Sequence, residues 1–157
     1  MKKVAIFADV QNIYYTTRDT FNRPFNYRAF YQELNYSHQI ITANAYAIDR
    51  GDQQQQKFQS ALRHIGFEVK LKPFIQRSDG SAKGDWDVGI TIDMMEAATE
   101  ADHIVLLSGD GDFAILLEHI KHKYSCTTSI YGVLNLTASA LINAADEFVD
   151  IDPKWLM

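Results

Sequence analysis

Hydrophobic and polar positions along the chain follow two patterns: short apolar or alternating runs, and longer stretches with an apolar residue every three or four positions. The short runs predict strands at 4–9, 39–49, 67–75, 103–108, 126–133 and 148–152. The longer stretches predict helices at 26–35, 52–66, 86–99, 113–124 and 137–148. Asp52 and Thr137 are expected to cap the starts of two helices, and Gly66 is expected to end the first of them.

Strands that alternate with helices are typical of an α/β fold, in which right-handed crossovers connect the strands of a mostly parallel sheet. We therefore expect a three-layer α/β/α sandwich with helices on both faces of the sheet. The 157 residues, 46% hydrophobic and 22% charged, suffice for a single domain over residues 1–157 with a substantial core. The sequence has no repeat and no low-complexity tract, and residues 77–85 are expected to form a polar loop.

The first residues and the single cysteine bear on the compartment in which the protein works. Residues 1–10 are basic and then apolar, but Asp9 ends the apolar run before it reaches the length of a signal-peptide core or a membrane span. Cys126 has no partner for an internal disulfide, fits a reducing compartment, and is expected to be a small buried residue of a strand. We expect a cytoplasmic protein with no membrane partner, and a homo-oligomer is compatible with the sequence.

Charge is distributed unevenly along the chain. The net charge of −5 argues against indiscriminate binding to polyanions. Residues 1–83 carry 12 Lys/Arg and 7 Asp/Glu, whereas residues 84–157 carry 3 and 13. Such asymmetry is found in proteins that contact nucleic acid, and also in ordinary solvated surfaces. The informative question is therefore where the acidic residues converge.

Acidic residues stand at the ends of several predicted elements. Asp9 ends the first strand in FADVQN, Asp87 opens a helix in KGDWDVGITID, and Asp110 and Asp112 follow a strand in LLSGDGDF. Each of them alone is a common turn former or helix cap. In open parallel sheets, however, sites form beyond the carboxyl ends of strands, where the strand order reverses. If the first strand and the strand at 103–108 are neighbours, Asp9 and Asp110 face one crevice.

Ionised carboxylates that share one crevice repel one another unless they are protonated or neutralised by a cation. The candidate metal ligands are Asp9, Asp87, Asp110 and Asp112. Hard oxygen ligands without a cysteine or a convincing histidine partner favour Mg²⁺ or Mn²⁺. A carboxylate-bound Mg²⁺ that keeps several waters commonly polarises a phosphate and activates water for in-line attack.

Further residues near these acids are candidates for supporting roles. Asn12 is expected to position a substrate phosphate or a metal-bound water. Asp93 points about 120° away from the first turn of its helix, so it supports the site from behind, pairs with Lys83 or faces solvent. Lys83 and Arg77 are candidates for contacts with a phosphate backbone, or are ordinary loop charges. Trp86 is a candidate for stacking on a base, or for packing in the core.

The segments FADVQN, KGDWDVGITIDMM and LLSGDGDF, in this order and spacing, resemble the NYN domain family, LabA-like branch, a relative of the PIN-like nucleases. The resemblance extends from Val4 to about Asp150. It implies a Rossmann-like α/β/α sandwich and a metal-dependent ribonuclease that acts on RNA. By motif match it carries over six catalytic-site residues: Asp9, Asn12, Asp87, Asp93, Asp110 and Asp112. Val10 stands where the family often has glycine.

Other interpretations of these motifs compete. GDGDFA also fits the dinucleotide-binding fingerprint, but it follows a late strand, and its two aspartates would repel a pyrophosphate. Gln11 occupies the place where a haloacid-dehalogenase-like phosphatase has a second aspartate, and no P-loop motif is present. Glu118, His119 and His122 share a predicted helix but lack a further ligand for zinc. The serious alternative is a catalytically weak NYN-like domain that binds RNA or a partner protein as a regulator.

Overall fold

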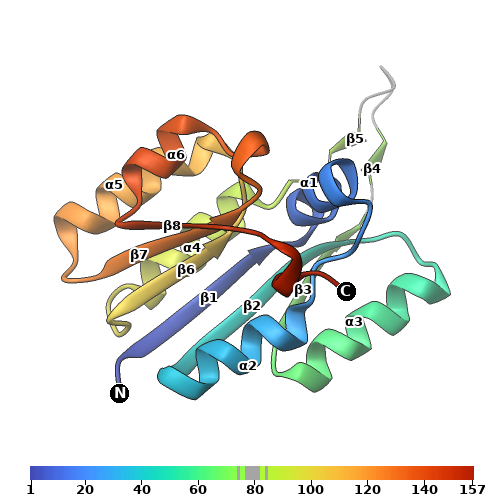
Figure 1. Ribbon diagram of the computed structural model, residues 1–157, viewed down its shortest axis with the longest axis horizontal. Coiled ribbons are helices and arrows are strands. Elements are labelled where there is room, and N and C mark those ends of the chain that lie inside the picture. Colours follow the sequence, from blue (N-terminus) through green and yellow to red (C-terminus); the bar gives the residue numbers. More distant parts are fainter. Residues whose placement is uncertain (74, 77–81, 84) are drawn as a thin grey trace.

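One sheet of six parallel strands forms the centre of the computed structural model, which describes every residue except 74, 77–81 and 84 (Figure 1). The strands are β1 (Lys3–Asp9), β2 (Gln39–Asp49), β3 (Glu68–Pro73), β6 (His103–Leu107), β7 (Thr127–Gly132) and β8 (Glu147–Asp150). Their order is β3-β2-β1-β6-β7-β8, and every neighbouring pair is parallel. Two short strands, β4 (Ile75–Gln76) and β5 (Ala82–Lys83), form a separate antiparallel pair.

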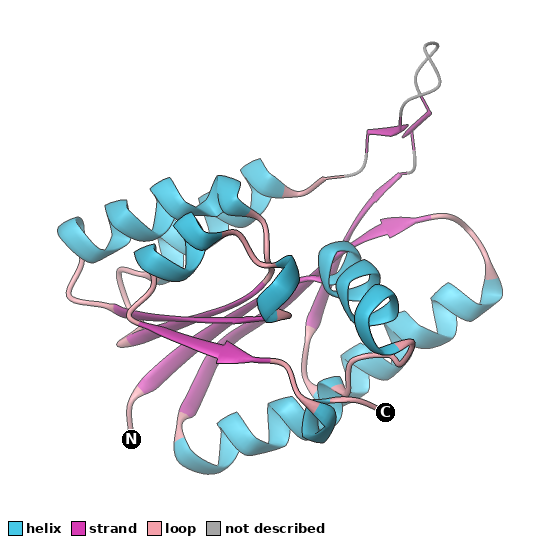
Figure 2. Cartoon of the chain, turned by 45° about the horizontal axis from the view of Figure 1, so that its top comes forward, coloured by secondary structure: helices cyan, strands magenta, loops and turns pink. Residues whose placement is uncertain are grey.

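Helices cover both faces of the sheet, which confirms the predicted three-layer α/β/α sandwich (Figure 2). One face carries α1 (Val10–Phe21), α2 (Tyr27–Ser37) and α3 (Gln53–Ile65). The other carries α4 (Asp87–Ala97), α5 (Ala114–Lys123) and α6 (Ser139–Ala144). Three short 3₁₀ turns complete the chain: η1 (Gly111–Phe113), η2 (Leu134–Leu136) and η3 (Pro153–Trp155). No helix among the described residues has the length and apolar character needed to cross a membrane.

Strand β1 lies in the middle of the sheet and is buried on both sides. Val4, Ile6 and Ala8 belong to the core beneath α1, α2 and α3. Ala5 and Phe7 belong to the core beneath α4, α5 and α6. Because successive side chains of a strand point to opposite faces, a strand covered on both faces must be apolar at every position. Asp9 is the first residue at which this run meets polar surroundings. Its carboxylate therefore lies where the carboxyl ends of the parallel strands meet.

Helix α1 is the main element that the periodicity does not predict. It begins immediately after β1, with Asp9 as its N-cap. Its buried residues are Val10, Ile13 and Thr17, and the hydroxyl of Thr17 donates a hydrogen bond to the Ile13 carbonyl at 2.7 Å. Only two of these three residues are apolar, so the buried stripe is too narrow to register as a helical pattern. The consequence is that Asp9 and Asn12 belong to a strand-to-helix junction rather than to a loop.

The two helices with expected capping residues, α3 and α6, differ in how they begin. The Asp52 side chain accepts a hydrogen bond from the Gln55 N–H at 2.7 Å, and Gly66 ends α3 at a φ of 134°, a backbone conformation that favours glycine. Both of these predictions are confirmed. Thr137 does not cap α6, because its hydroxyl donates to the Val133 carbonyl and the helix begins later, at Ser139. Cys126 is buried as expected, directly before β7.

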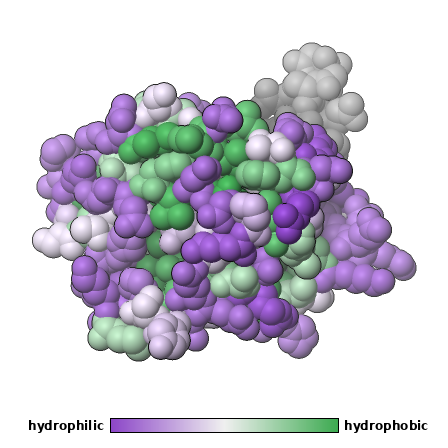
Figure 3. All heavy atoms as spheres, in the orientation of Figure 1, coloured by the Kyte–Doolittle hydropathy of each residue, from purple (hydrophilic) through white to green (hydrophobic). Residues whose placement is uncertain are grey.

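The surface near α6 carries an exposed hydrophobic area. Figure 3 shows hydrophobic residues gathered over the part of the molecule that contains α6 and the turn before it. In that turn, Leu134 and Leu136 of η2 are exposed. A homo-oligomer, which the sequence leaves open, remains a prediction.

Candidate metal centre

The strand order reverses at β1, and this creates a crevice beyond the carboxyl ends of β1 and β6. Strand β1 pairs with β2 on one side and with β6 on the other. Asp9 is the last residue of β1, and Ala8 beside it pairs with Leu107, the last residue of β6. The expectation that these two strands are neighbours is therefore confirmed. Ligand sites of open α/β sheets form at such a position.

Three carboxylates converge at this crevice from separate parts of the chain. Asp87 is the first residue of α4, and Asp110 and Asp112 lie on the turn after β6. One carboxylate oxygen from each of them lies within 4.8 Å of the other two. Oxygen ligands that share one Mg²⁺ are at most about 4 Å apart, since each bond is about 2.1 Å long. Small movements of these side chains would therefore bring all three onto one ion.

Asp9 lies beneath these three residues rather than among them. Its Oδ2 accepts a hydrogen bond from the Ser108 hydroxyl at 3.1 Å, and its Oδ1 accepts from the Asn12 N–H at 3.5 Å. Burial raises the pKa of the Asp9 carboxyl to about 6, although these two hydrogen bonds lower it. The charges of Asp110 and Asp85 raise it further. The Asp9 carboxyl is thus buried, accepts hydrogen bonds from Ser108 and Asn12, and is repelled by the charges of Asp110 and Asp85.

Asp87 has the most perturbed carboxyl of this region. Burial raises its pKa to about 7, and the charges of Asp110, Asp85, Asp9 and Asp112 add to the effect in that order. We call this set the acidic cluster; its members are Asp9, Asp85, Asp87, Asp110 and Asp112. All four of these neighbouring charges have the same sign as an ionised Asp87, so they repel one another.

The turn between β6 and α5 is held in place by its serine and glycines. Ser108 donates to Asp9 and also accepts a hydrogen bond from the Asp110 N–H at 3.1 Å. A side chain on Gly109 would place its Cβ 2.6 Å from the Leu136 carbonyl oxygen, so only glycine fits this approach. Asp110 forms the tight turn after β6, because its Oδ1 accepts the Asp112 N–H at 2.9 Å, whereas no side chain among the described residues caps α5. The exposed Asp112 carboxylate is left facing its acidic neighbours.

Asn12 connects α1 to the same turn. Its Oδ1 accepts the Gly109 N–H at 2.9 Å. Because a backbone N–H can only donate, this bond fixes which end of the amide is the oxygen. The other end is the NH₂ group, a donor suited to a phosphate oxygen or to a metal-bound water.

Asp93 lies outside the three converging carboxylates, as its angular position on α4 predicts. Its Oδ2 forms an ion pair with Lys70 Nζ at 2.7 Å and accepts a hydrogen bond from the Tyr46 hydroxyl at 2.8 Å. Asn44 Nδ2 in turn donates to that hydroxyl at 3.1 Å. Among the residues whose side chains are described, the charged partner of Asp93 is therefore Lys70 of β3; pairing with Lys83 was one of three alternatives that the sequence left open. Since Tyr46 pairs with Asp9 in the sheet, Asp93 supports the strand beside the site.

The structure describes the three residues predicted to contact substrate to different extents. The Trp86 indole N–H donates to the Ala47 carbonyl at 2.9 Å, and Lys72 Nζ lies 4.6 Å from the ring centre. These contacts favour the packing role for Trp86, and stacking on a base stays a prediction. Lys83 lies in β5, paired with Ile75, and Arg77 lies outside the described residues.

Two members of this region, Asp85 and Ser108, were not predicted as site residues. Asp85 Oδ1 accepts the Asp87 N–H at 3.4 Å, and its charge raises the pKa values of Asp9 and Asp87. Asp85 stands two residues before Asp87, and Ser108 begins the SGDGD turn, so their positions inside the motifs were the available signal. By contrast, Glu118 and His122 form an exposed pair at 3.6 Å on α5, as expected for a solvated helix face.

Comparisons with known proteins agree with this arrangement. The NYN domain family model matches residues 3–152. The low amplitude and bright protein LabA of Synechococcus elongatus is 30% identical over 161 residues, covering 96% of this chain and 84% of that protein. The crystal structure of a protein of unknown function from Vibrio parahaemolyticus is 49% identical, with a TM-score of 0.94, and covers 99% of this chain and 96% of that one. Ribokinase from Giardia lamblia, at 12% identity and a TM-score of 0.50, covers 94% of this chain and 57% of that one, and shares the fold alone.

Proposed function

The chain belongs to the NYN domain family and is LabA-like, and we propose that it is a metal-dependent ribonuclease whose ion binds at the acidic cluster. The observation that carries the proposal is the convergence of Asp87, Asp110 and Asp112, with oxygen atoms within 4.8 Å of one another. Family membership supports a nuclease or RNA-related role, and the cluster supports a divalent cation. Metal-dependent hydrolysis of RNA is the reaction that agrees with both the family and a divalent cation.

The residues of the cluster fit a hard divalent ion. All of its donors are carboxylate oxygens, which suit Mg²⁺ or Mn²⁺ rather than zinc or copper. Burial and mutual repulsion raise the pKa of Asp87 to about 7 and that of Asp9 to about 6. A dication would remove this repulsion and lower both pKa values, since an opposite charge favours the ionised carboxylate.

Each residue of the site has a distinct proposed task. Asp87, Asp110 and Asp112 would hold the ion, and when bound it would polarise the phosphate and activate water for attack. Asp9 adds negative charge beside the three ligands, and the hydrogen bond from Ser108 fixes the position of its carboxylate. Asn12 offers its NH₂ group to a phosphate oxygen, because Gly109 already occupies its carbonyl end.

The test is metal-dependent cleavage of RNA by the purified chain. Labelled single-stranded and structured RNAs are incubated with Mn²⁺, Mg²⁺ or EDTA, and the fragments are counted. Cleavage that needs Mn²⁺ or Mg²⁺ and is lost in Asp110→Asn supports the proposal. Asp102→Asn is the matched control, because Asp102 lies at the opposite end of β6, where its side chain accepts the Lys3 N–H.

Two outcomes would contradict the proposal. Fragments that form equally in EDTA, or that persist in Asp110→Asn, would remove the metal centre from the reaction. RNA binding without any fragments would favour the alternative of a catalytically weak regulator that binds RNA or a partner protein.

A further inference from the structure

A second concave site lies beside the acidic cluster, on the other side of α1. It is an open pocket of about 390 Å³ between α1, residues 24–27, the end of β2 and the first half of α3. Five aromatic rings line it, those of Tyr14, Tyr15, Phe25, Tyr27 and Phe58. We call it the aromatic pocket. Its volume falls within the range of small-molecule sites, which is about 300–1,000 Å³.

The rings of the aromatic pocket are arranged as a buried floor and an exposed mouth. Phe25 and Tyr27 are buried and pack edge to face with their centres 4.9 Å apart. Tyr14 is 53% exposed and Phe58 is 38% exposed, so both rings present a face or an edge to solvent. The centre of the Phe58 ring lies 5.8 Å from that of Tyr27. Exposed rings at the mouth of a concave site offer faces on which a flat ligand can stack.

The aromatic pocket adjoins the acidic cluster through three connections. Val10 and Gln11 line the pocket and directly follow Asp9 in the chain. Ala47 also lines it, and the carbonyl of Ala47 accepts the indole N–H of Trp86, the residue before Asp87. Burial raises the pKa of Tyr27, and the charge of Asp9 raises it further, which places the two within electrostatic reach. The pocket and the cluster are therefore built on neighbouring residues of the same elements.

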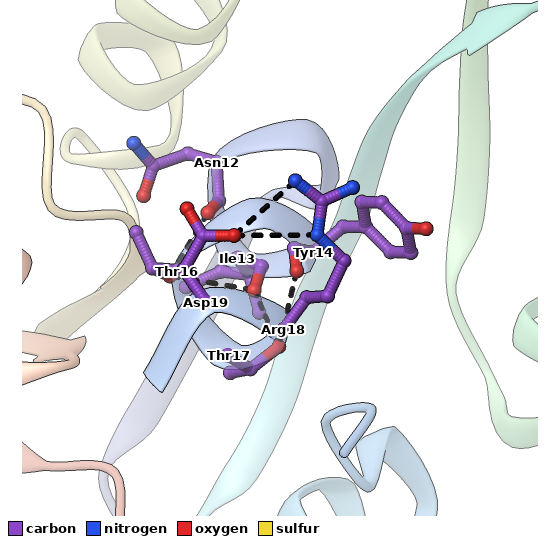
Figure 4. A network of polar contacts seen from close by, with 7 residues as sticks. All are labelled: Asn12, Ile13, Tyr14, Thr16, Thr17, Arg18 and Asp19. Atoms are coloured by element: carbon purple, nitrogen blue, oxygen red, sulfur yellow. Dashed lines mark hydrogen bonds and ion pairs between the residues drawn. The ribbon is translucent and has the colours of Figure 1, made fainter. Parts of the chain in front are cut away.

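Helix α1 separates the two sites and contributes side chains to both. Figure 4 shows Asn12 and Tyr14 on opposite sides of this helix, with the Arg18 guanidinium between Tyr14 and Asp19. Asn12 is bonded to Gly109 beside the acidic cluster, whereas Tyr14 lines the aromatic pocket. Arg18 lies 5.4 Å from the centre of the Tyr14 ring and pairs with Asp19 at 3.2 Å. Arg18 thus packs beside the Tyr14 ring while its charge is paired with that of Asp19.

The lining of the pocket favours a neutral, flat ligand with hydrogen-bonding edges. Arg50 and Asp52 are the charged residues of the lining and have opposite signs, and the Asp52 carboxylate already accepts the Gln55 N–H as the cap of α3. An anionic group in the pocket would lie next to the acidic cluster and be repelled by it. Gln11 and Gln54 supply amide groups, which can donate to and accept from the edge of a base. A nucleobase combines the flat face, the neutral charge and the polar edge that these residues suit.

We propose that the aromatic pocket binds one unpaired nucleobase of an RNA strand and thereby places the adjoining phosphate at the acidic cluster. This inference rests on the proposed ribonuclease function, because it assigns the neighbouring base of the same substrate. Tyr14 and Phe58 provide stacking surfaces at the mouth, and the amides of Gln11 and Gln54 meet the base edge. A base must leave its stack to enter the pocket, so single-stranded RNA is the expected substrate.

The first experiment measures binding of unphosphorylated nucleosides, adenosine and uridine, by protein-observed NMR titration in EDTA. A nucleoside has no phosphate and needs no metal, so its binding does not depend on the acidic cluster or on cleavage. We expect shifts confined to the residues that line the pocket, and an affinity weakened about tenfold in Tyr14→Ala and in Phe58→Ala. Tyr36→Ala is the matched control, because Tyr36 of α2 is 90% exposed and lies outside the pocket. Thermal unfolding confirms that each variant is folded.

The second experiment moves a single abasic residue along a cleavable RNA. We expect one fixed position beside the cut to slow cleavage about tenfold in the wild type, and not to slow it further in Tyr14→Ala. If nucleosides cause no chemical-shift changes, or bind with the same affinity to both pocket variants, the proposal that the aromatic pocket binds a base is overturned, whether or not RNA is cleaved. Nucleoside binding at the pocket without any metal-dependent cleavage overturns the ribonuclease and leaves the base site standing.

Discussion

Two regions of helix α4 hold an aspartate each, and the two carboxylates have opposite surroundings. At the start of the helix, Asp87 faces other carboxylates, and burial and repulsion raise its pKa to about 7. In the middle, Asp93 forms an ion pair with Lys70 and accepts a hydrogen bond from Tyr46. The polar groups of the second region satisfy one another, whereas the charges that raise the pKa of Asp87 among the described residues are all negative. The same residue type therefore lies among repelling charges at one end of the helix and in a charge-balanced contact in its middle.

The largest effect expected from this difference is on cleavage. Asp87→Asn removes one of the three proposed metal ligands and should reduce Mn²⁺-dependent cleavage of RNA at least about a hundredfold, since a bound metal contributes several kcal/mol to transition-state stabilisation. Asp93→Asn is the matched change on the same helix and should leave the rate close to that of the wild type. Initial rates at saturating Mn²⁺ compare the two. Equal losses in both variants would erase the distinction between the regions.

The second expected effect is on the pH dependence of stability in EDTA. The pKa of Asp9 is about 6 in the folded chain and 3.8 as the ordinary value, so the folded state binds more protons between these values. The free energy of unfolding should therefore fall as the pH rises from about 4 to about 7, by about 3 kcal/mol from Asp9 alone. Urea unfolding at several pH values measures this. Mn²⁺ at pH 7.5 should restore the lost stability. A profile without this fall would contradict the raised pKa of Asp9 in the folded chain.

The third expected effect is on the stability of the paired region. Asp93→Ala removes the acceptor of both Lys70 and Tyr46 and should lower the free energy of unfolding by about 1–2 kcal/mol. The side chains of Lys70 and Asp93 are 31% and 21% exposed, so solvent screens part of the ion pair. A double-mutant cycle with Lys70→Met should give a coupling free energy of about 1 kcal/mol. A coupling of zero would show that the ion pair contributes nothing to folding.

The smallest expected effect is at the contact below the acidic cluster. Ser108→Ala removes the hydroxyl that donates to Asp9 and should lower the free energy of unfolding by about 1 kcal/mol. It should also raise the pKa of Asp9 in EDTA, because the hydrogen bond from Ser108 lowers that pKa. NMR titration of the carboxyl carbon reports the change. An unaltered pKa would mean that the hydrogen bond does not stabilise the carboxylate.

The sequence predicted the sheet well because its strands are buried on both faces. The continuous apolar run of β1 and the position of Asp9 at its end follow from that burial alone. Helix α1 was missed because its buried stripe includes Thr17, whose hydroxyl bonds to the helix backbone instead of to a polar neighbour. Periodicity detects apolar residues, so a helix that buries a satisfied hydroxyl escapes it.

The candidate site was predictable in part. Asp110 and Asp112 flank a glycine directly after a strand, and fold-level rules bring that strand end next to Asp9. The pairing of Asp93 with Lys70 was not predictable, because it depends on the position of β3 two strands away from β1. The role of Ser108 depends on a 3.1 Å contact between residues 99 positions apart, which neither spacing nor composition encodes.

The most direct test of the metal centre is the anomalous difference density of crystals soaked in Mn²⁺. The account predicts a strong peak within coordination distance of Asp87, Asp110 and Asp112, and no peak beside Asp93 and Lys70. Crystals of Asp110→Asn should lose the peak under the same soak. A well-ordered wild-type structure with no peak among the three carboxylates at millimolar Mn²⁺ would contradict the proposal that this cluster is a dication site.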